Sequence, residues 1–149
     1  MTRSSISGSL LGIVMGGMIA LVACSDSTSS TARITVGRPL SLFFQAGNGA
    51  PPPPPISGVG GIGRVRVTGG YEGAACGPPR GTAHRDGNLV TLDVEAVVPN
   101  PPCDAARVVY NYDATIMGLE ASEYTLEVYH RTDPAGVRRL VQRVRVTVQ

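Results

Sequence analysis

Two acidic residues, Asp93 and Glu95, are the candidates for acid–base chemistry in this sequence. They alternate within "LVTLDVEAVV", Leu89 to Val98, so on a strand both side chains point to the same side. Paired carboxylates act as general acid and base when a cleft holds them and their pKa values differ. On an exposed strand, carboxylates more often pair with arginines of a neighbouring strand, and we expect Arg64 and Arg66 to be those partners.

The chain has two histidines, and it lacks a G-x-S-x-G nucleophile motif. His130 continues the inward phase of the run before it, so we expect a structural residue at a strand end. We expect His84 to be solvated beside a turn. Zinc is often held by two cysteines and two histidines, here Cys76, Cys103, His84 and His130. Because no pair of them has the short spacing typical of zinc sites, we expect no metal and no other cofactor.

The stretch "GVGGIG", Gly58 to Gly63, matches the G-x-G-x-x-G spacing of dinucleotide-binding loops. Such a loop must follow a strand and open a helix that points its N-terminus at the pyrophosphate. Here the glycines follow the polyproline segment "APPPPPIS" and lead into "RVRVT", a strand pattern. We therefore expect no nucleotide binding.

Composition excludes several classes of protein. The 13 basic and 11 acidic residues leave no charge excess that would favour nucleic acid, and all the basic residues are arginines. Glycine (19) and proline (12) are abundant, which favours turns and short strands over long helices. The length of 149 residues suits one ordinary domain.

The N-terminus predicts an export signal. Arg3 supplies a short positive segment, Ile6 to Ala20 is apolar with small residues, and "LVAC", Leu21 to Cys24, follows. A transmembrane anchor and an ordinary signal peptide are the alternatives. The high glycine content and the polar stretch that follows argue against a spanning helix.

The four residues "LVAC" resemble the lipobox of bacterial lipoproteins, a resemblance that covers only the first 24 residues. It implies that a diacylglyceryl group is attached to the Cys24 sulfur and that the signal is cut between Ala23 and Cys24. Two or three acyl chains hold a protein on a membrane, because each buried methylene contributes roughly 0.8 kcal/mol. Ser25, rather than Asp, follows the cysteine, which favours the outer membrane under the family's sorting rule if the host has one. Residues 25–32 then form a flexible polar tether.

Lipidation of Cys24 leaves Cys76 and Cys103, and export brings them into an oxidising compartment where a disulfide persists. A hairpin turn at Asp86-Gly87 would return the chain from Cys76 towards Cys103. We expect these two cysteines to form a disulfide, which would stabilise the fold by roughly 3.6 kcal/mol on the chain-entropy estimate.

From residue 33 onward, apolar and polar residues alternate in short runs, which is typical of half-buried strands. A type I turn in "TDPAGV" joins the last two runs as a hairpin. About seven such runs separated by turns predict a single antiparallel β-sandwich over residues 33–149. The inward residues are expected to be Ile34, Val36, Leu40, Leu42, Phe44, Val65, Val67, Val90, Leu92, Val94, Ala96, Val98, Val108, Tyr110, Tyr112, Ala114, Ile116, Tyr124, Leu126, Val128, Val144, Val146 and Val148.

The run "IMGLEASEYTLEVYH", Ile116 to His130, resembles the corner between the fifth and sixth strands of fibronectin type III and related immunoglobulin-like modules. That pattern is matched by Gly118, Leu119, Tyr124, Leu126 and Val128, whereas Ser122 stands where many relatives have glycine. The resemblance implies an immunoglobulin-like sandwich in which Leu119 and Tyr124 are structural and the Tyr124 hydroxyl bonds back to the corner backbone. The resemblance supports a fold and gives no information about an activity.

Residues 46–62 are expected to form a long Pro/Gly-rich loop. A disordered surface loop, display of Pro51 to Pro55 to a partner with an aromatic groove, and exclusion of residues 33–45 from the sandwich are the three interpretations.

The string "RVRVT" occurs at Arg64 to Thr68 and again at Arg143 to Thr147. If both strands lie in one sheet, Arg64, Arg66, Arg143 and Arg145 line its outer face, where they could meet anionic headgroups or polysaccharide. Chance recurrence of a simple strand pattern is the alternative.

Together these patterns predict a bacterial lipoprotein that is held on the cell envelope by lipid on Cys24. Its domain is expected to be a non-catalytic structural or binding module with an envelope protein or polysaccharide as partner. The alternatives are an envelope hydrolase that acts on a surface polymer through Asp93, Glu95 or a histidine, and a soluble secreted binding protein.

Overall fold

The computed structural model describes residues 37–75, 77–97, 106–132 and 136–149. All of them belong to the compact unit Ile34–Gln149. Ala23, Cys24, Cys76 and Cys103 lie outside the described residues, so lipidation, cleavage and the disulfide stay predictions.

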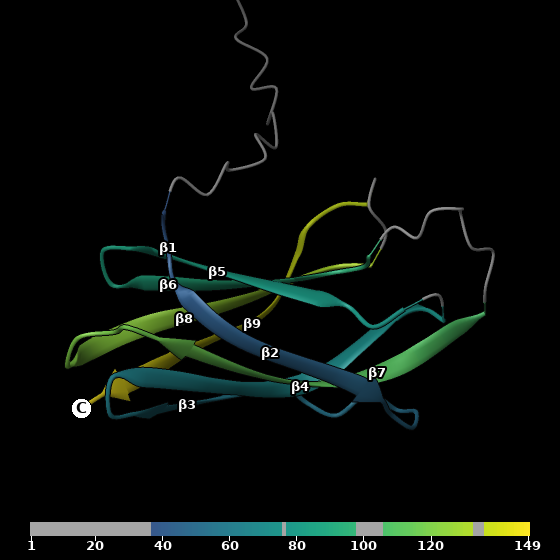
Figure 1. Cartoon of the computed structure of the whole chain (residues 1–149), viewed down its shortest axis with the longest axis horizontal. Helices are drawn as coiled ribbons and strands as arrows, with labels where there is room; N and C mark the ends of the chain where they lie inside the picture. The colour runs from purple at the N-terminus through teal and green to yellow at the C-terminus, as the bar shows by residue number, and fades with distance from the viewer. Residues whose placement is uncertain (1–36, 76, 98–105, 133–135) are drawn as a thin grey trace, which may run out of the picture. The chain divides into compact units, whose positions relative to one another are not determined.

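The described residues form nine strands and no helix. The strands are β1 (Arg38–Pro39), β2 (Ser41–Asn48), β3 (Ser57–Gly61), β4 (Arg64–Ala74), β5 (Arg80–Asp86), β6 (Leu89–Glu95), β7 (Arg107–Met117), β8 (Ser122–Arg131) and β9 (Arg139–Val148). A five-stranded sheet has the order β1-β5-β6-β8-β9, and a four-stranded sheet has the order β2-β7-β4-β3. Figure 1 shows these sheets as two stacked layers, which confirms the predicted all-β sandwich.

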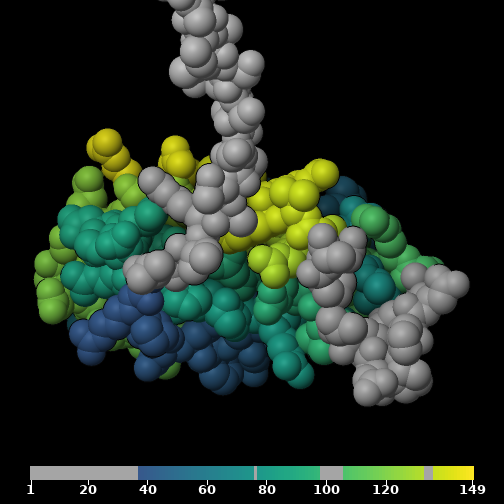
Figure 2. All heavy atoms as spheres, turned by 90° about the horizontal axis from the view of Figure 1, so that it is seen from above, coloured from purple at the N-terminus to yellow at the C-terminus, as the bar shows by residue number. Residues whose placement is uncertain are grey.

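The core lies between the sheets and is built from alternate residues of each long strand, as the period-two pattern predicted. Among the described residues, nine side chains in it are fully shielded from solvent: Val65, Val67, Val90, Leu92, Val94, Ala114, Ile116, Leu126 and Val128. Tyr71 and Tyr124, each at 1% exposure, are the largest fully buried side chains of this core. From above, β5 and β6 (teal) and β9 (yellow) form much of the visible surface of the five-stranded layer (Figure 2).

The chain passes between the two sheets at its first strands. β1 pairs with β5, β2 pairs with β7, and only Leu40 separates them. The Leu40 amide donates to the Ala83 carbonyl at 3.0 Å, which holds this crossing against β5. The interpretation that residues 33–45 lie outside the sandwich is therefore wrong for the part from Arg38 onward.

The strands β3 and β9 close the opposite side of the sandwich. A Cβ on Gly60 would lie 1.9 Å from the Thr147 carbonyl oxygen, so only glycine allows the two backbones to approach this closely. The Gly63 amide donates to the Gln149 carbonyl at 3.0 Å, and the Gln149 amide donates to Gly61 at 3.1 Å. "GVGGIG" is thus strand β3 and its turn into β4, and its glycines allow close packing of two edge strands.

The predicted loop over residues 46–62 is wrong, because β2 extends to Asn48 and β3 begins at Ser57. The segment between them is fastened to the domain by Gly49, whose amide donates to Val109 at 2.8 Å, and by Gly70, whose amide donates to Pro54 at 3.1 Å. Pro53 and Pro54 occupy the space that a Cβ on Gly70 would need. Pro51 to Pro55 are exposed and form a fixed part of the domain surface.

The expected hairpin between β5 and β6 is present, one residue further along than predicted. Asp86 pairs with Leu89, so the two turn residues are Gly87 and Asn88, with Gly87 at φ +57°. A positive φ is what glycine supplies in such short hairpins.

One strand pair of the otherwise antiparallel sandwich is parallel. β6 and β8 run side by side in the same direction, with Leu92 opposite Val128. The chain leaves the five-stranded sheet after β6, forms β7 in the other sheet and returns as β8, so it re-enters in its original direction. This reversal through a second sheet cannot be read from local alternation.

The corner before β8 has the structural contacts that the resemblance implied. The Tyr124 hydroxyl donates to the Glu120 carbonyl at 3.1 Å, four residues earlier, and Leu119 is buried. Gly118 adopts φ +81°, and its amide and that of Leu119 both donate to Gly63 at 3.2 Å. The Arg85 guanidinium lies 5.2 Å from the centre of the Tyr124 ring. The corner is therefore fixed to two other strand ends.

Candidate binding face of the four-stranded sheet

The four arginines of the repeated "RVRVT" do not form one patch. Arg64 and Arg66 lie on β4 in the four-stranded sheet, and Arg143 and Arg145 lie on β9 in the five-stranded sheet. The expectation that all four arginines share one face is wrong, because the two strands with the identical sequence belong to different sheets.

The two arginines on β9 already have acidic partners. Arg143 pairs with Glu127, its Nε lying 2.8 Å from the carboxylate, and Arg145 lies 3.9 Å from Glu123. These partners come from the facing strand β8, where Glu127 is opposite Arg143 in the register. The β9 arginines therefore belong to a cross-strand charge ladder.

The outer face of the four-stranded sheet has side chains in regular cross-strand rows. One row runs Phe43, Thr115, Arg66, Val59 from β2 through β7 and β4 to β3. The next row runs Gln45, Asp113, Thr68, Ser57. Neighbouring strands are about 4.8 Å apart, so each row crosses roughly 14 Å of surface.

Unequal side-chain sizes hollow this face. Small residues such as Thr115, Thr68 and Gly61 lie between the longer Phe43, Arg64 and Arg66, and the open hollow has a volume of about 610 Å³. Its lining residues are Phe43, Gln45, Ser57, Val59, Gly60, Gly61, Arg64, Arg66, Thr68, Asp113 and Thr115. We call this surface the β2–β3 face.

An ion pair crosses the centre of the β2–β3 face. The Arg66 Nε donates to both carboxylate oxygens of Asp113 at 3.1 Å, and a second guanidinium nitrogen contacts the same carboxylate. The hydrogen bond from Arg66 lowers the pKa of the Asp113 carboxyl. Arg64, two residues earlier on the same strand face, has no ion pair among the residues that the structure describes. The face therefore carries one unbalanced positive charge.

Apolar side chains lie at both ends of the row that runs from Phe43 to Val59. Phe43 is 55% exposed and Val59 is 63% exposed, although both belong to strands that are paired within the sheet. Sequence reasoning assigned Phe44 to the core and overlooked Phe43. The available signal was an aromatic residue on the outward phase of β2, where polar residues are expected.

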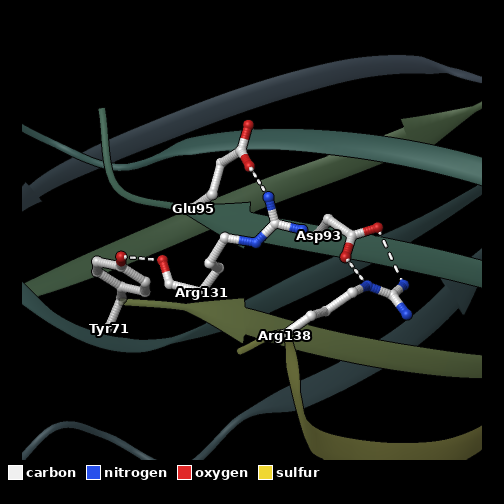
Figure 3. A network of polar contacts seen from close by, with 5 residues as sticks. All are labelled: Tyr71, Asp93, Glu95, Arg131 and Arg138. Atoms are coloured by element: carbon white, nitrogen blue, oxygen red, sulfur yellow. Dashed lines mark hydrogen bonds and ion pairs between the residues drawn. The ribbon is translucent and has the colours of Figure 1, made fainter. Parts of the chain in front are cut away.

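The proposed acid–base pair on β6 is divided between two separate ion pairs (Figure 3). Asp93 accepts from Arg138, with Nη2 at 3.1 Å from Oδ2, and Glu95 lies 3.6 Å from Arg131. The expectation that Arg64 and Arg66 pair with these carboxylates is wrong, because β4 lies in the other sheet. Each carboxylate is matched by its own arginine, an arrangement typical of a structural charge ladder.

The ladder continues along the outer face of the five-stranded sheet. The Arg138 guanidinium lies 3.3 Å from the centre of the Tyr129 ring, and the Tyr129 hydroxyl donates to Glu127 at 2.6 Å. Glu127 is only 7% exposed, and hydrogen bonds from Tyr129 and Arg143 outweigh the effect of burial and lower its pKa. Glu127 and Arg138 therefore both have partners within the ladder.

His130 faces the core, as its phase predicted. Its Nε2 lies 3.2 Å from the Tyr112 hydroxyl, and its ring packs edge-on against Tyr71 and Tyr112. Burial lowers the pKa of the imidazole to about 4, so the ring is neutral at pH 7. It is therefore a packed residue of the sandwich interior.

His84 lies on the outer face of the same sheet, where it is opposite Thr91 on β6 and Pro39 on β1. Its Nδ1 is buried and has no hydrogen-bond partner among the described residues, so the expectation of a solvated ring is wrong for this atom. Because His130 points inward and His84 outward, the two cannot bind the same metal ion. The described residues contain no cluster of three or more potential metal ligands.

In the described part of the chain, no helix is long and apolar enough to cross a membrane. No protein-family model, curated protein or solved structure matches the chain. Any functional inference therefore depends on the residues themselves.

Proposed function

We propose that this chain is a lipid-anchored protein of the bacterial cell envelope whose β-sandwich acts as a non-catalytic binding module. Lipid on Cys24 would hold it on the membrane, and residues 25–32 would separate the domain from the bilayer. The partner would be an envelope protein or polysaccharide.

The sequence "LVAC" supports the envelope location. The positive residue, the apolar run and the cysteine occur in the order and at the distance from Met1 that a lipoprotein signal requires. The outer membrane is favoured by Ser25.

The β2–β3 face supports the binding role, and it is the observation that carries this part of the proposal. It combines exposed Phe43 and Val59 with hydrogen-bonding side chains on a rigid sheet. Rigid strands hold such groups in place without an ordering cost when a ligand binds.

The alternative of an envelope hydrolase receives less support. Asp93 and Glu95 are each paired with an arginine from the β8–β9 part of the same sheet, and His130 is packed in the interior. A soluble secreted binding protein, with Cys24 unmodified, would keep the same binding face.

Mass spectrometry of the N-terminal peptide, combined with cell fractionation, tests the location. We expect the mature chain to begin at an acylated Cys24, and a Cys24→Ala variant to lose this acylated form. Soluble, unacylated protein that begins near residue 24 would favour the secreted alternative. An intact Met1 would overturn the proposal.

A further inference from the structure

We propose that the β2–β3 face binds an acidic polysaccharide, laid across the strands along the row Phe43, Thr115, Arg66, Val59. This inference depends on the proposed binding role and names the ligand class for it. It is independent of where the protein is anchored.

The row and its neighbours combine apolar side chains with hydrogen-bonding ones, and a sugar ring likewise has an apolar C–H side and a polar hydroxyl edge. The C–H side of a pyranose is apolar and flat, so it can cover the exposed ring of Phe43 and remove both from water. The ring's hydroxyl edge needs donors and acceptors, which Gln45, Thr68 and Thr115 supply on the neighbouring positions.

The order of the groups favours an elongated ligand. The apolar ends of the row, Phe43 on β2 and Val59 on β3, are separated by the polar positions Thr115 and Arg66. Roughly 14 Å therefore separates the ends, which one small molecule would not span. A polymer that crosses the strands can contact both ends.

The charge of the face favours an acidic polymer. Asp113 balances Arg66, and Arg64 adds a guanidinium that no described carboxylate neutralises. A guanidinium binds a carboxylate through two parallel hydrogen bonds, which gives both affinity and orientation. Uronic-acid units carry such a carboxylate on a sugar ring.

A protein partner fits the face less well. Stable protein interfaces bury about 800 Å² on each partner, and their buried centre is more apolar and poorer in charged residues than their rim. Here the centre of the row is polar, and the apolar residues lie at its edges.

Affinity electrophoresis tests the inference with full-length protein in detergent micelles and two probes, polygalacturonate and neutral dextran. We expect retardation by polygalacturonate, weakened by added salt, and at most weak retardation by dextran. Arg64→Gln should weaken polygalacturonate binding about tenfold.

Two matched controls come from the other sheet. Arg145→Gln removes the same charge at an 81% exposed side chain, and Val141→Ala removes an exposed apolar group as Phe43→Ala does. We expect both controls to bind like the unmodified protein and Phe43→Ala to bind several-fold more weakly. Circular dichroism melting curves check that each variant is folded.

Three outcomes overturn the inference: no retardation by polygalacturonate, equal retardation by dextran, or equal losses for Arg64→Gln and Arg145→Gln. Failure here leaves the location part of the proposed function standing, because acylation of Cys24 is measured separately. If a purified envelope protein bound and Phe43→Ala abolished that binding while polygalacturonate failed, the face would be a protein interface instead.

Discussion

Arg66 on β4 and Asp113 on β7 form a two-point ion pair diagonally across neighbouring strands, with Nε 3.1 Å from both carboxylate oxygens. Both side chains are exposed, at 64% and 37%, so water screens their attraction. We therefore expect the pair to fix the orientation of its two side chains on the β2–β3 face and to contribute little to the free energy of unfolding.

The pair predicts a measurable change in the titration of Asp113. Its pKa is lowered chiefly by the hydrogen bond from Arg66, so Arg66→Gln should raise that pKa towards the ordinary value of 3.8. NMR titration of the Asp113 carboxyl carbon measures this directly. Any stability from the pair should be present above pH 4 and lost as the pH falls through the lowered pKa. An unchanged titration curve would mean that the two side chains are not paired in solution.

The Tyr124 hydroxyl should stabilise the corner between β7 and β8. Tyr124→Phe removes its bond to Glu120 while keeping the ring, which is 1% exposed. We expect the free energy of unfolding to fall by about 1 kcal/mol in urea titrations. Ser122→Ala, in the same corner, is the control and should change it by less than about 0.5 kcal/mol. If both variants lost the same free energy of unfolding, the Tyr124 hydroxyl would have no particular role in stabilising this corner.

Gly60 should be essential for closing the sandwich. A Cβ there would lie 1.9 Å from the Thr147 carbonyl oxygen, so Gly60→Ala must push β3 away from β9. We expect a loss of about 3 kcal/mol or more, seen as a lower thermal midpoint. Gly61→Ala is the matched control, because its Cβ would meet only Arg64 at an ordinary 3.6 Å. If the two variants have the same thermal midpoint, β3 and β9 do not pack as closely as the structure indicates.

His130 should make the fold sensitive to mild acid. Burial lowers its pKa to about 4, whereas the unfolded ring titrates near 6.5. Between these values the unfolded chain binds a proton that the folded chain does not, so stability is lost as the pH falls from 6.5 to 4. Allowing for the partly exposed ring, we expect a loss of about 2 kcal/mol in urea titrations.

The matched variant His130→Gln keeps a polar partner for Tyr112 but does not titrate. It should therefore show little change in stability over the same pH window. A variant that loses stability as steeply as the unmodified protein would assign the effect to other groups.

Much of the fold could be predicted from the sequence because its determinants are local. The alternation of Val90, Leu92 and Val94 against Thr91 and Asp93 predicted which side of β6 faces the core, since successive side chains of a strand point to opposite faces. Thr91, on the other side, is also buried, which the pattern did not predict. The bond from the Tyr124 hydroxyl to Glu120 was predictable for a similar reason, because it joins two residues only four positions apart.

The site was less predictable than the fold. "RVRVT" reads the same in β4 and β9, yet the two copies lie in different sheets, so no arginine patch exists. Likewise, Asp93 and Glu95 pair with Arg138 and Arg131, which no alternation pattern connects to them.

By itself, the sequence determined most of the strand-forming segments, the buried phase of those strands and the expected address carried by Cys24. It did not predict β3, which lies inside the expected loop. Only the tertiary structure decided that Phe43 and Val59 lie in one row, that β6 and β8 are parallel, and that Gly60 touches Thr147. The physical reason is that burial phase depends on neighbours two residues apart. Sheet membership and register depend instead on pairings between residues that are far apart along the chain.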